Sequence, residues 1–288
     1  MNSPFSLRKD IDLIGAGLSL SRGQLAAALT VPRATFDRYY YGKSPVPDSF
    51  LNALYGFAFK KKLALAEIKK AVAEQDLQPG EIPLFHGSRH SLLGQILPQG
   101  KATNDFGPGF YLGQSYEQAY LFLYNHPNSN CYEFAFQSAG LGIRHFALSY
   151  EWMVALAYFR EAMPENYRHA SLPERLAKEI RESDVVVAPI ADNRMFALLS
   201  SFFRNQITDE EAIHSLAAIH LGEQYVMKSV KATSSLRLLS ASFVSDAERD
   251  FFKTEREKEL ESKESDLEQI HLSYGRKGHY WSELWPSL

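Results

Sequence analysis

Apolar residues at three- and four-residue spacing predict two short helices near the N-terminus, over residues 21–29 and 33–40. Ser21 is a suitable N-cap for the first helix, and Pro32 suits the first position of the second. The polar and apolar pattern of the surrounding sequence is also helical. We therefore expect an all-α domain over residues 1–78.

After a turn-rich junction, short apolar runs alternate with amphipathic segments. The runs predict strands over residues 84–86, 131–136, 184–190 and 225–229. The amphipathic segments predict helices over residues 116–124, 194–203 and 209–218, with Ser115 and Thr208 as N-caps and Glu211 at a capping-box position. The pattern therefore predicts an α+β domain over residues 79–243.

The C-terminal region is strongly charged. Residues 246–271 contain ten acidic and five basic residues, which predicts a solvated helix. A basic and aromatic stretch follows from Tyr274 to Trp281, with Trp285 beyond it, and it docks either on the body of the protein or on a partner. We expect a helical tail over residues 244–288.

Composition excludes several classes of protein. A formal net charge of -3 argues against a globally basic nucleic-acid coat protein, and an apolar content of 45% is ample for a packed core. Cys131 is the only cysteine, so an intramolecular disulfide is excluded and a reducing cytosol is favoured. The N-terminus has no secretory pattern, and we see no apolar window long enough to span a membrane. We expect a cytoplasmic protein.

Two short words carry the candidate chemistry. His86-Gly87-Ser88 ends a predicted strand, and Gly109-Phe110-Tyr111 follows about 20 residues later. A lone histidine on an apolar strand is more often a core residue, but a following glycine lets a ligand approach the backbone closely. The Gly107-Pro108-Gly109 loop before Tyr111 likewise indicates a backbone that bends close to a ligand.

Four words lie in order between residues 82 and 242, and together they resemble a bacterial family with the ADP-ribosyltransferase fold, largely of unknown function. The words are His86-Gly87-Ser88, the stretch from Asn104 to Leu112, the stretch from Ile190 to Met195, and the stretch from Leu221 to Val226. The resemblance implies a split β-sandwich with helices, and it implies NAD as co-substrate.

The resemblance also implies roles for individual residues. His86 would reach a ribose hydroxyl, Gly87 would let the nicotinamide amide approach, and Ser88 would bind a ribose hydroxyl. Tyr111 would stack on nicotinamide, with Phe110 beside it and Tyr120 as a second ring, although both tyrosines could equally be core residues. Arg194 would bind a phosphate, for which its planar guanidinium is suited. Asp192 could simply cap the following helix.

The catalytic position is the main departure from the fold's usual pattern. Classical members of the fold place a glutamate on a late strand, where its charge stabilises the cation that develops on the ribose. Here the matching residue is Gln224, and Glu223 precedes it. Because neighbouring strand residues point to opposite faces, only one of them faces the site unless a bulge intervenes, and the register favours Gln224.

The two N-terminal helices resemble a helix-turn-helix of the phage-repressor type. Residues 1–80 contain 11 Lys or Arg against 7 Asp or Glu, and Arg33, Thr35 and Arg38 would lie on the exposed side of the second helix. These residues are candidates for DNA contacts. The alternative is a plain helical bundle with a basic face, which would bind a partner protein instead.

These features support two functional hypotheses. The first is an NAD-dependent mono-ADP-ribosyltransferase that modifies an intracellular protein or nucleic acid, as a toxin or phage-defence effector that regulates itself through DNA binding. The second is a catalytically inactive transcriptional regulator that senses NAD. An antitoxin or chaperone is a further candidate partner. The nine histidines are scattered and form no ligand set, so we predict no metal site.

Overall fold

The computed structural model describes residues 7–92, 94–123, 125–163, 165–191, 193–219 and 222–284. The chain is an α+β protein in two compact units, each assembled from separated stretches of sequence. The first unit comprises Met1–Gly94, Ser115–Gln137 and Arg237–Glu255. The second unit comprises Gln95–Gln114, Ser138–Leu236 and Arg256–Leu288.

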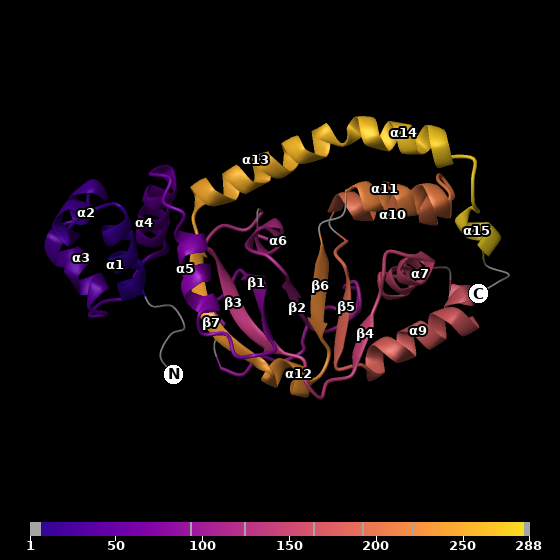
Figure 1. The fold of residues 1–288 in the computed structure, drawn as a ribbon, viewed down its shortest axis with the longest axis horizontal. Coiled ribbons are helices and arrows are strands. Elements are labelled where there is room, and N and C mark those ends of the chain that lie inside the picture. Colours follow the sequence, from indigo (N-terminus) through magenta and orange to yellow (C-terminus); the bar gives the residue numbers. More distant parts are fainter. Residues whose placement is uncertain are drawn as a thin grey trace. The chain divides into compact units, whose positions relative to one another are not determined.

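The N-terminal segment is helical, as predicted (Figure 1). Its helices are α1 (Leu7–Gly17), α2 (Arg22–Ala28), α3 (Arg33–Tyr40), α4 (Asp48–Lys60) and α5 (Leu65–Glu74). Ser21 caps α2 by accepting from the Gln24 amide, and the Gln24 side chain closes a capping box. Pro32 was expected at the first helical position. It is instead the N-cap of α3, because its ψ of 134° is still extended.

A strand from far along the chain completes the core of these helices. The buried side chains include Ile14, Leu25, Phe36 and Leu54, and Phe243 of β7 (Leu236–Val244) packs in the same cluster. The compact unit therefore extends beyond the domain expected over residues 1–78, since the apolar face of the helices is covered by this strand.

The strands of the first unit lie in the order β1-β3-β7. β1 (Glu81–Ser88) and β3 (Ser129–Gln137) are antiparallel, with Leu84 paired to Phe134. Helix α6 (Tyr116–Leu121) begins after Ser115, whose side chain accepts from the Gln118 amide in a capping box. The predicted strands over residues 84–86 and 131–136 and the N-cap at Ser115 are confirmed.

The strands of the second unit lie in the order β4-β5-β6-β2. They are β2 (Phe110–Gly113), β4 (Ile143–His145), β5 (Val185–Pro189) and β6 (Glu223–Met227). β4 is parallel to β5, whereas the β5–β6 and β6–β2 pairs are antiparallel. Every residue of β5 is buried, which explains its unbroken apolar sequence. Both strands predicted here exist, and β6 begins two residues earlier than expected.

Helices surround this second group of strands (Figure 1). They are α7 (Tyr150–Phe159), α8 (Glu165–Arg168), α9 (Ser171–Glu182), α10 (Asn193–Phe203), α11 (Asp209–Ala218) and α12 (Val230–Ser234). Thr208 caps α11, as predicted, by accepting from the Glu211 amide. The Glu211 carboxylate, however, pairs with Nδ1 of His271 at 2.7 Å, so a tertiary contact takes the group expected to complete the capping box.

The charged C-terminal run is helical, as predicted. It forms α13 (Asp246–Ser262) and α14 (Glu264–Tyr274), neither of which has a buried residue in its described length. The aromatic stretch then docks on the body of the second unit through α15 (Trp281–Leu284): Trp281 is 1% exposed and packs against Phe202 and Phe203. Trp285 lies outside the described residues. No helix in the described parts of the chain is long and apolar enough to cross a membrane.

Glu133 of β3 is a buried acid with an incomplete set of partners. Ser240 donates to Oε2 at 2.9 Å, whereas Oε1 is buried and has no partner in the part of the chain that the structure describes. Burial raises the pKa of Glu133 from 4.5 to about 7. The folded state therefore binds this proton more tightly than the unfolded state does.

This shift predicts a pH-dependent stability. The contribution of Glu133 is fully present below about pH 4.5 and is lost as pH rises through about 7. The wild type should lose free energy of unfolding between pH 5 and pH 9, and Glu133→Gln should reduce this loss by up to roughly 3 kcal/mol. Urea unfolding measures the difference. Exposed Glu117 provides the control, because Glu117→Gln should leave the pH profile unchanged. Equal profiles for wild type and Glu133→Gln would contradict this assignment.

Candidate functional site

The predicted site residues are divided between the two units. His86, Gly87, Ser88 and Tyr120 belong to the first unit, and Phe110, Tyr111, Arg194, Glu223 and Gln224 belong to the second.

The glycine of the first word is required by the fold itself. Gly87 lies in β1, paired with Cys131, and a Cβ there would come within 2.6 Å of the Ala119 carbonyl oxygen in α6. His86 pairs with Tyr132 in the same ladder. Gly87 thus permits the close approach of helix α6 to the backbone of β1. The approach of a ligand to Gly87 stays a prediction, as do the roles of His86 and Ser88.

Tyr120 is part of the core of the first unit. Its side chain is 3% exposed, and its ring is stacked on Phe252 at 4.6 Å between centroids. Tyr116 packs against it at a tilted angle. In this arrangement one ring face is already covered by an aromatic side chain, so a role in stacking on nicotinamide stays a prediction that the packing does not favour.

In the second unit, strand pairing brings Tyr111 and Gln224 to the same face. Tyr111 of β2 pairs with Val226, and Gly113 pairs with Gln224 of β6. Ala188 of β5 pairs with Gln224 on its other side. Since paired residues share a face, the carboxamide of Gln224 lies between a glycine and an alanine, neither of which extends beyond Cβ.

Phe110 and Glu223 lie on the opposite face by the same alternation. Phe110 is buried, and Glu223 Oε2 accepts from Gln114 Nε2 at 3.3 Å. Two of the predicted residues are therefore separated from Tyr111 and Gln224. In the observed register Gln224, and not Glu223, shares the face of Tyr111, and which of the two residues faces a ligand stays a prediction.

Gln224 is held by two acceptors. Its Nε2 donates to Asp105 Oδ2 at 2.9 Å and to the Pro189 carbonyl oxygen at 3.1 Å. Because both partners can only accept, the orientation of the carboxamide is fixed. Its Oε1 has no hydrogen-bond partner among the described residues. Gln224 is 3% exposed, and this acceptor, which no described residue uses, could bind a ligand hydroxyl.

Asp105 joins Gln224 to a cation. Oδ1 of Asp105 accepts from Arg160 Nε at 2.7 Å and from Arg160 Nη2. Arg160 also donates to the Ala191 carbonyl oxygen at 3.2 Å, and its guanidinium lies 4.0 Å from the centroid of the Phe196 ring. The carboxylate therefore has donors on both of its oxygens.

Sequence reasoning did not assign a role to Asp105 or Arg160. Asp105 lies inside the word that runs from Asn104 to Leu112, beside Phe106 and Gly107. This position in the sequence could have identified it as a candidate site residue. Arg160 directly follows the apolar helix α7, and nothing in its local sequence indicates that it meets a residue 55 positions earlier.

Tyr111 organises the loop that carries Asp105. Its hydroxyl donates to the Gly107 carbonyl oxygen at 2.7 Å and accepts from the Phe106 amide at 3.2 Å. Burial raises the pKa of Tyr111, so the phenol stays protonated and able to donate. Gly107 has a φ of 72°, which a glycine adopts without strain. The bend of this loop is therefore explained by contacts within the unit.

A lysine supports the same loop. Lys228 Nζ donates to the carbonyl oxygens of Phe106 and Pro108. Burial, and to a lesser degree the charge of Arg181, lowers the pKa of Lys228 to about 8. The ammonium that fixes the loop thus titrates near pH 8.

Arg194 lies in the first turn of α10 and is half-buried, with no hydrogen-bond partner among the described residues. Its predicted phosphate contact stays a prediction, and Asp192 lies outside the described residues. Among the residues that the structure describes, no three His, Cys, Asp or Glu side chains converge as a metal-binding group.

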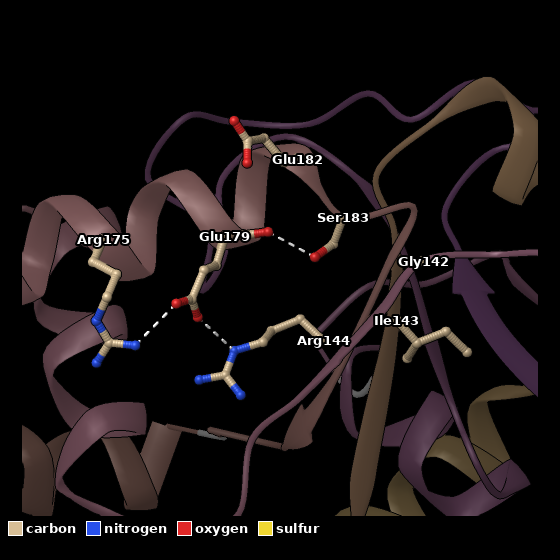
Figure 2. Close-up of a pocket in the computed structure, with 7 residues that line it drawn as sticks. All are labelled: Gly142, Ile143, Arg144, Arg175, Glu179, Glu182 and Ser183. Atoms are coloured by element: carbon tan, nitrogen blue, oxygen red, sulfur yellow. Dashed lines mark hydrogen bonds and ion pairs between the residues drawn. The ribbon is translucent and has the colours of Figure 1, made fainter.

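A hollow elsewhere in the second unit holds none of the predicted residues. It has a volume of about 420 Å³ and lies beside β4 and α9 (Figure 2). Figure 2 shows Glu179 between Arg144 and Arg175. The Glu179 carboxylate binds each arginine at 2.9 Å. Because Arg144, Arg175 and Glu179 already neutralise one another, we do not assign this hollow as the site.

The DNA-binding candidates lie on α3. Arg33 and Arg38 are exposed, whereas Thr35 is half-buried. Arg33 Nε pairs with Asp37 at 2.8 Å, and Arg38 Nη2 donates to Thr35 Oγ1 at 3.3 Å. An exposed ion pair such as Arg33–Asp37 contributes only about 0.3–0.5 kcal/mol, so Arg33 can exchange its partner for a phosphate.

The family relationship follows from one comparison. A family model described as "Protein of unknown function (DUF3990)" matches residues 82–238, close to the domain expected over residues 79–243. No match was found among curated proteins or among solved structures. Since the matched region covers more than half of the 288 residues, the chain belongs to the DUF3990 family.

Proposed function

We propose that the protein is an NAD-dependent mono-ADP-ribosyltransferase with an ADP-ribosyltransferase-like fold over the family region, acting on an intracellular macromolecule as a toxin or phage-defence effector. The observation that carries the proposal is Oε1 of Gln224, which accepts no hydrogen bond from the described residues and is held on β6 on the same face as Tyr111. The words that resemble the transferase family include both residues.

The proposed reaction consumes NAD as a substrate. The bond between C1′ of the ribose and the pyridinium nitrogen breaks, and its electron pair leaves with nicotinamide. An acceptor nucleophile forms a new bond to C1′, and its proton goes to solvent. Positive charge builds on the ribose between these events, so a group that holds a ribose hydroxyl and directs negative partial charge toward the ribose would lower the barrier.

The residues of the second unit suit such a ligand in three respects. Gln224 Oε1 is an acceptor for a ribose hydroxyl, the small Gly113 and Ala188 on either side leave room for it, and Tyr111 provides an aromatic ring on the same face. The chain's own part in the reaction is to bind the hydroxyl and orient the ribose. A neutral glutamine should stabilise the cation less than a glutamate would.

The first test is binding of NAD. A ligand at ten times its Kd stabilises the folded state by about 1.4 kcal/mol, which corresponds to a rise of a few degrees in Tm. We expect this shift for the wild type at millimolar NAD, and we expect Tyr111→Ala to abolish it by removing the ring. Tyr111→Phe is the matched control: it keeps the ring and deletes only the hydroxyl that binds Gly107.

Activity is tested separately, by incubating the protein with labelled NAD and cell lysate. Release of nicotinamide with transfer of label to protein or nucleic acid is the expected result. The absence of both a thermal shift and nicotinamide release would refute the proposed function.

A second candidate function is an NAD-sensing transcriptional regulator without catalysis. It is favoured by the neutral Gln224 and by the exposed arginines of α3. The sensor hypothesis would replace the enzyme hypothesis if NAD binds and no label is transferred. DNA affinity should then change with NAD, because a ligand shifts an equilibrium only through different affinities for its states.

DNA binding itself makes a prediction under either function. DNA from the protein's own promoter should bind with an affinity that falls steeply as salt rises. Arg33→Ala and Arg38→Ala should each weaken binding, and each lost phosphate contact should lower the salt slope by about 0.9. Lys178→Ala, an exposed change on α9, is the charge-matched control. No retention of any DNA at low salt would identify the N-terminal helices as a protein-binding bundle.

A further inference from the structure

We infer that Asp105, anchored by Arg160, is a positioning residue that fixes and polarises Gln224 for the reaction. This inference rests on the proposed function and extends it to two residues for which the family resemblance implied no role. Asp105 Oδ2 lies 2.9 Å from Gln224 Nε2, and Oδ1 lies 2.7 Å from Arg160 Nε.

The three side chains form one chain of donors and acceptors. Arg160 donates to Asp105, Asp105 accepts from Gln224, and Gln224 presents Oε1 as the last acceptor. A carboxylate that accepts from the NH2 group of a carboxamide pushes electron density toward its carbonyl oxygen, since successive hydrogen bonds polarise one another. The Oε1 oxygen at that far end thus carries more negative charge than the oxygen of an isolated glutamine.

The burial of the cluster makes this arrangement specific. Asp105 is 8% exposed and Gln224 is 3% exposed, so water does not readily replace either partner. Arg160 supplies the positive charge that a buried carboxylate requires. The negative charge therefore lies on Asp105, which contacts Gln224, and not on residue 224 itself, where a glutamate would carry it. The neutral Gln224 keeps a fixed orientation.

The geometry predicts which substitutions the cluster tolerates. Both neighbours of Asp105 donate, so an asparagine at this position must turn its amide toward either Arg160 or Gln224 and meet another donor. Gln224→Glu places an acceptor against acceptors, because the new carboxylate oxygen takes the place of Nε2 and faces Asp105 and the Pro189 carbonyl oxygen. Combining Asp105→Asn with Gln224→Glu restores a donor opposite an acceptor at the shared contact.

The experiment measures nicotinamide release and NAD affinity on the full chain for wild type, both single variants and the double variant. Asp105→Asn should lower kcat by about 10–100-fold, the usual range for a residue that orients another. NAD affinity, measured by calorimetry, should change by less than about tenfold, the equivalent of one hydrogen bond. The double variant should exceed Gln224→Glu by at least tenfold at pH 8.

The pH profile separates positioning from a merely structural role. In Gln224→Glu, protonation of the introduced carboxyl supplies the missing donor, so activity should rise as pH falls, whereas the double variant should depend less on pH. Glu179→Gln, which disturbs arginine–carboxylate pairs elsewhere in the same unit, is the control and should retain full activity. Melting temperatures identify any variant that fails to fold. In that case Arg160→Lys provides the comparison, because it keeps the positive charge and loses the contact of two nitrogens with Asp105.

Three outcomes overturn the inference. A wild-type rate in Asp105→Asn shows that Gln224 needs no positioning, and single effects that simply multiply in the double variant show that the residues act independently. In both cases the proposed function stands. Failure of the wild type to release nicotinamide overturns the proposed function, and the inference fails with it.

Discussion

Replacing Gln224 with alanine is expected to slow nicotinamide release from NAD by on the order of 10²–10³-fold, the usual cost of removing one preorganised group at a site of developing charge. The substitution deletes Oε1 and also removes the Nε2 group that donates to Asp105 at 2.9 Å. The measurement is steady-state release of nicotinamide at saturating NAD.

Glu223→Ala is the matched control for this experiment. Glu223 is the adjacent strand residue, it lies on the opposite face, and its carboxylate accepts from Gln114. We expect it to cost much less than Gln224→Ala. The reverse order, with Glu223 essential and Gln224 dispensable, would show that the face assigned to the reaction is wrong.

Replacing Asp10 with alanine is expected to have the largest effect on stability, a loss of about 3–5 kcal/mol. Asp10 is buried in α1 and accepts from the Tyr55 hydroxyl and from Lys69 Nζ, the latter at 2.8 Å. Lys69 also donates to the Ala241 carbonyl oxygen of β7. Removing the carboxylate leaves the ammonium of Lys69 buried without its counter-charge.

The free energy of unfolding in urea measures this effect. Asp12→Ala is the matched control, because Asp12 lies on the same helix but is exposed, and its carboxylate accepts only from Tyr40 among the described residues. The double variant Asp10→Leu with Lys69→Met should lose less than Asp10→Ala, since it removes both charges together. Equal losses in Asp10→Ala and Asp12→Ala would contradict the importance of this buried pair.

Local signals in the sequence determined the elements. Ser21, Ser115 and Thr208 cap the helices for which they were predicted, because the hydrogen bond of an N-cap joins residues three positions apart. Strand alternation likewise places Gln224 and Glu223 on opposite faces from their adjacency in the sequence alone. Such features depend on neighbours along the chain, so the sequence contains them directly.

Features that depend on distant residues are not accessible in this way. Tyr120 is equally consistent with a ligand-stacking ring or a core ring, and the stacked Phe252 from α13 is what covers it. The sequence allows Trp281 to dock either on the protein or on a partner, and its contacts with Phe202 and Phe203 decide between the two. In each case the partner lies more than 70 positions away.

The sequence by itself determined the helical N-terminal segment, the α+β character of the family region and the candidates Tyr111 and Gln224. Only the tertiary structure decided that Asp105 and Arg160 meet Gln224, over separations of 119 positions for Asp105 and Gln224 and 55 for Asp105 and Arg160. The physical reason is that burial of a carboxylate demands a counter-charge and donors, and the fold alone selects which side chains supply them.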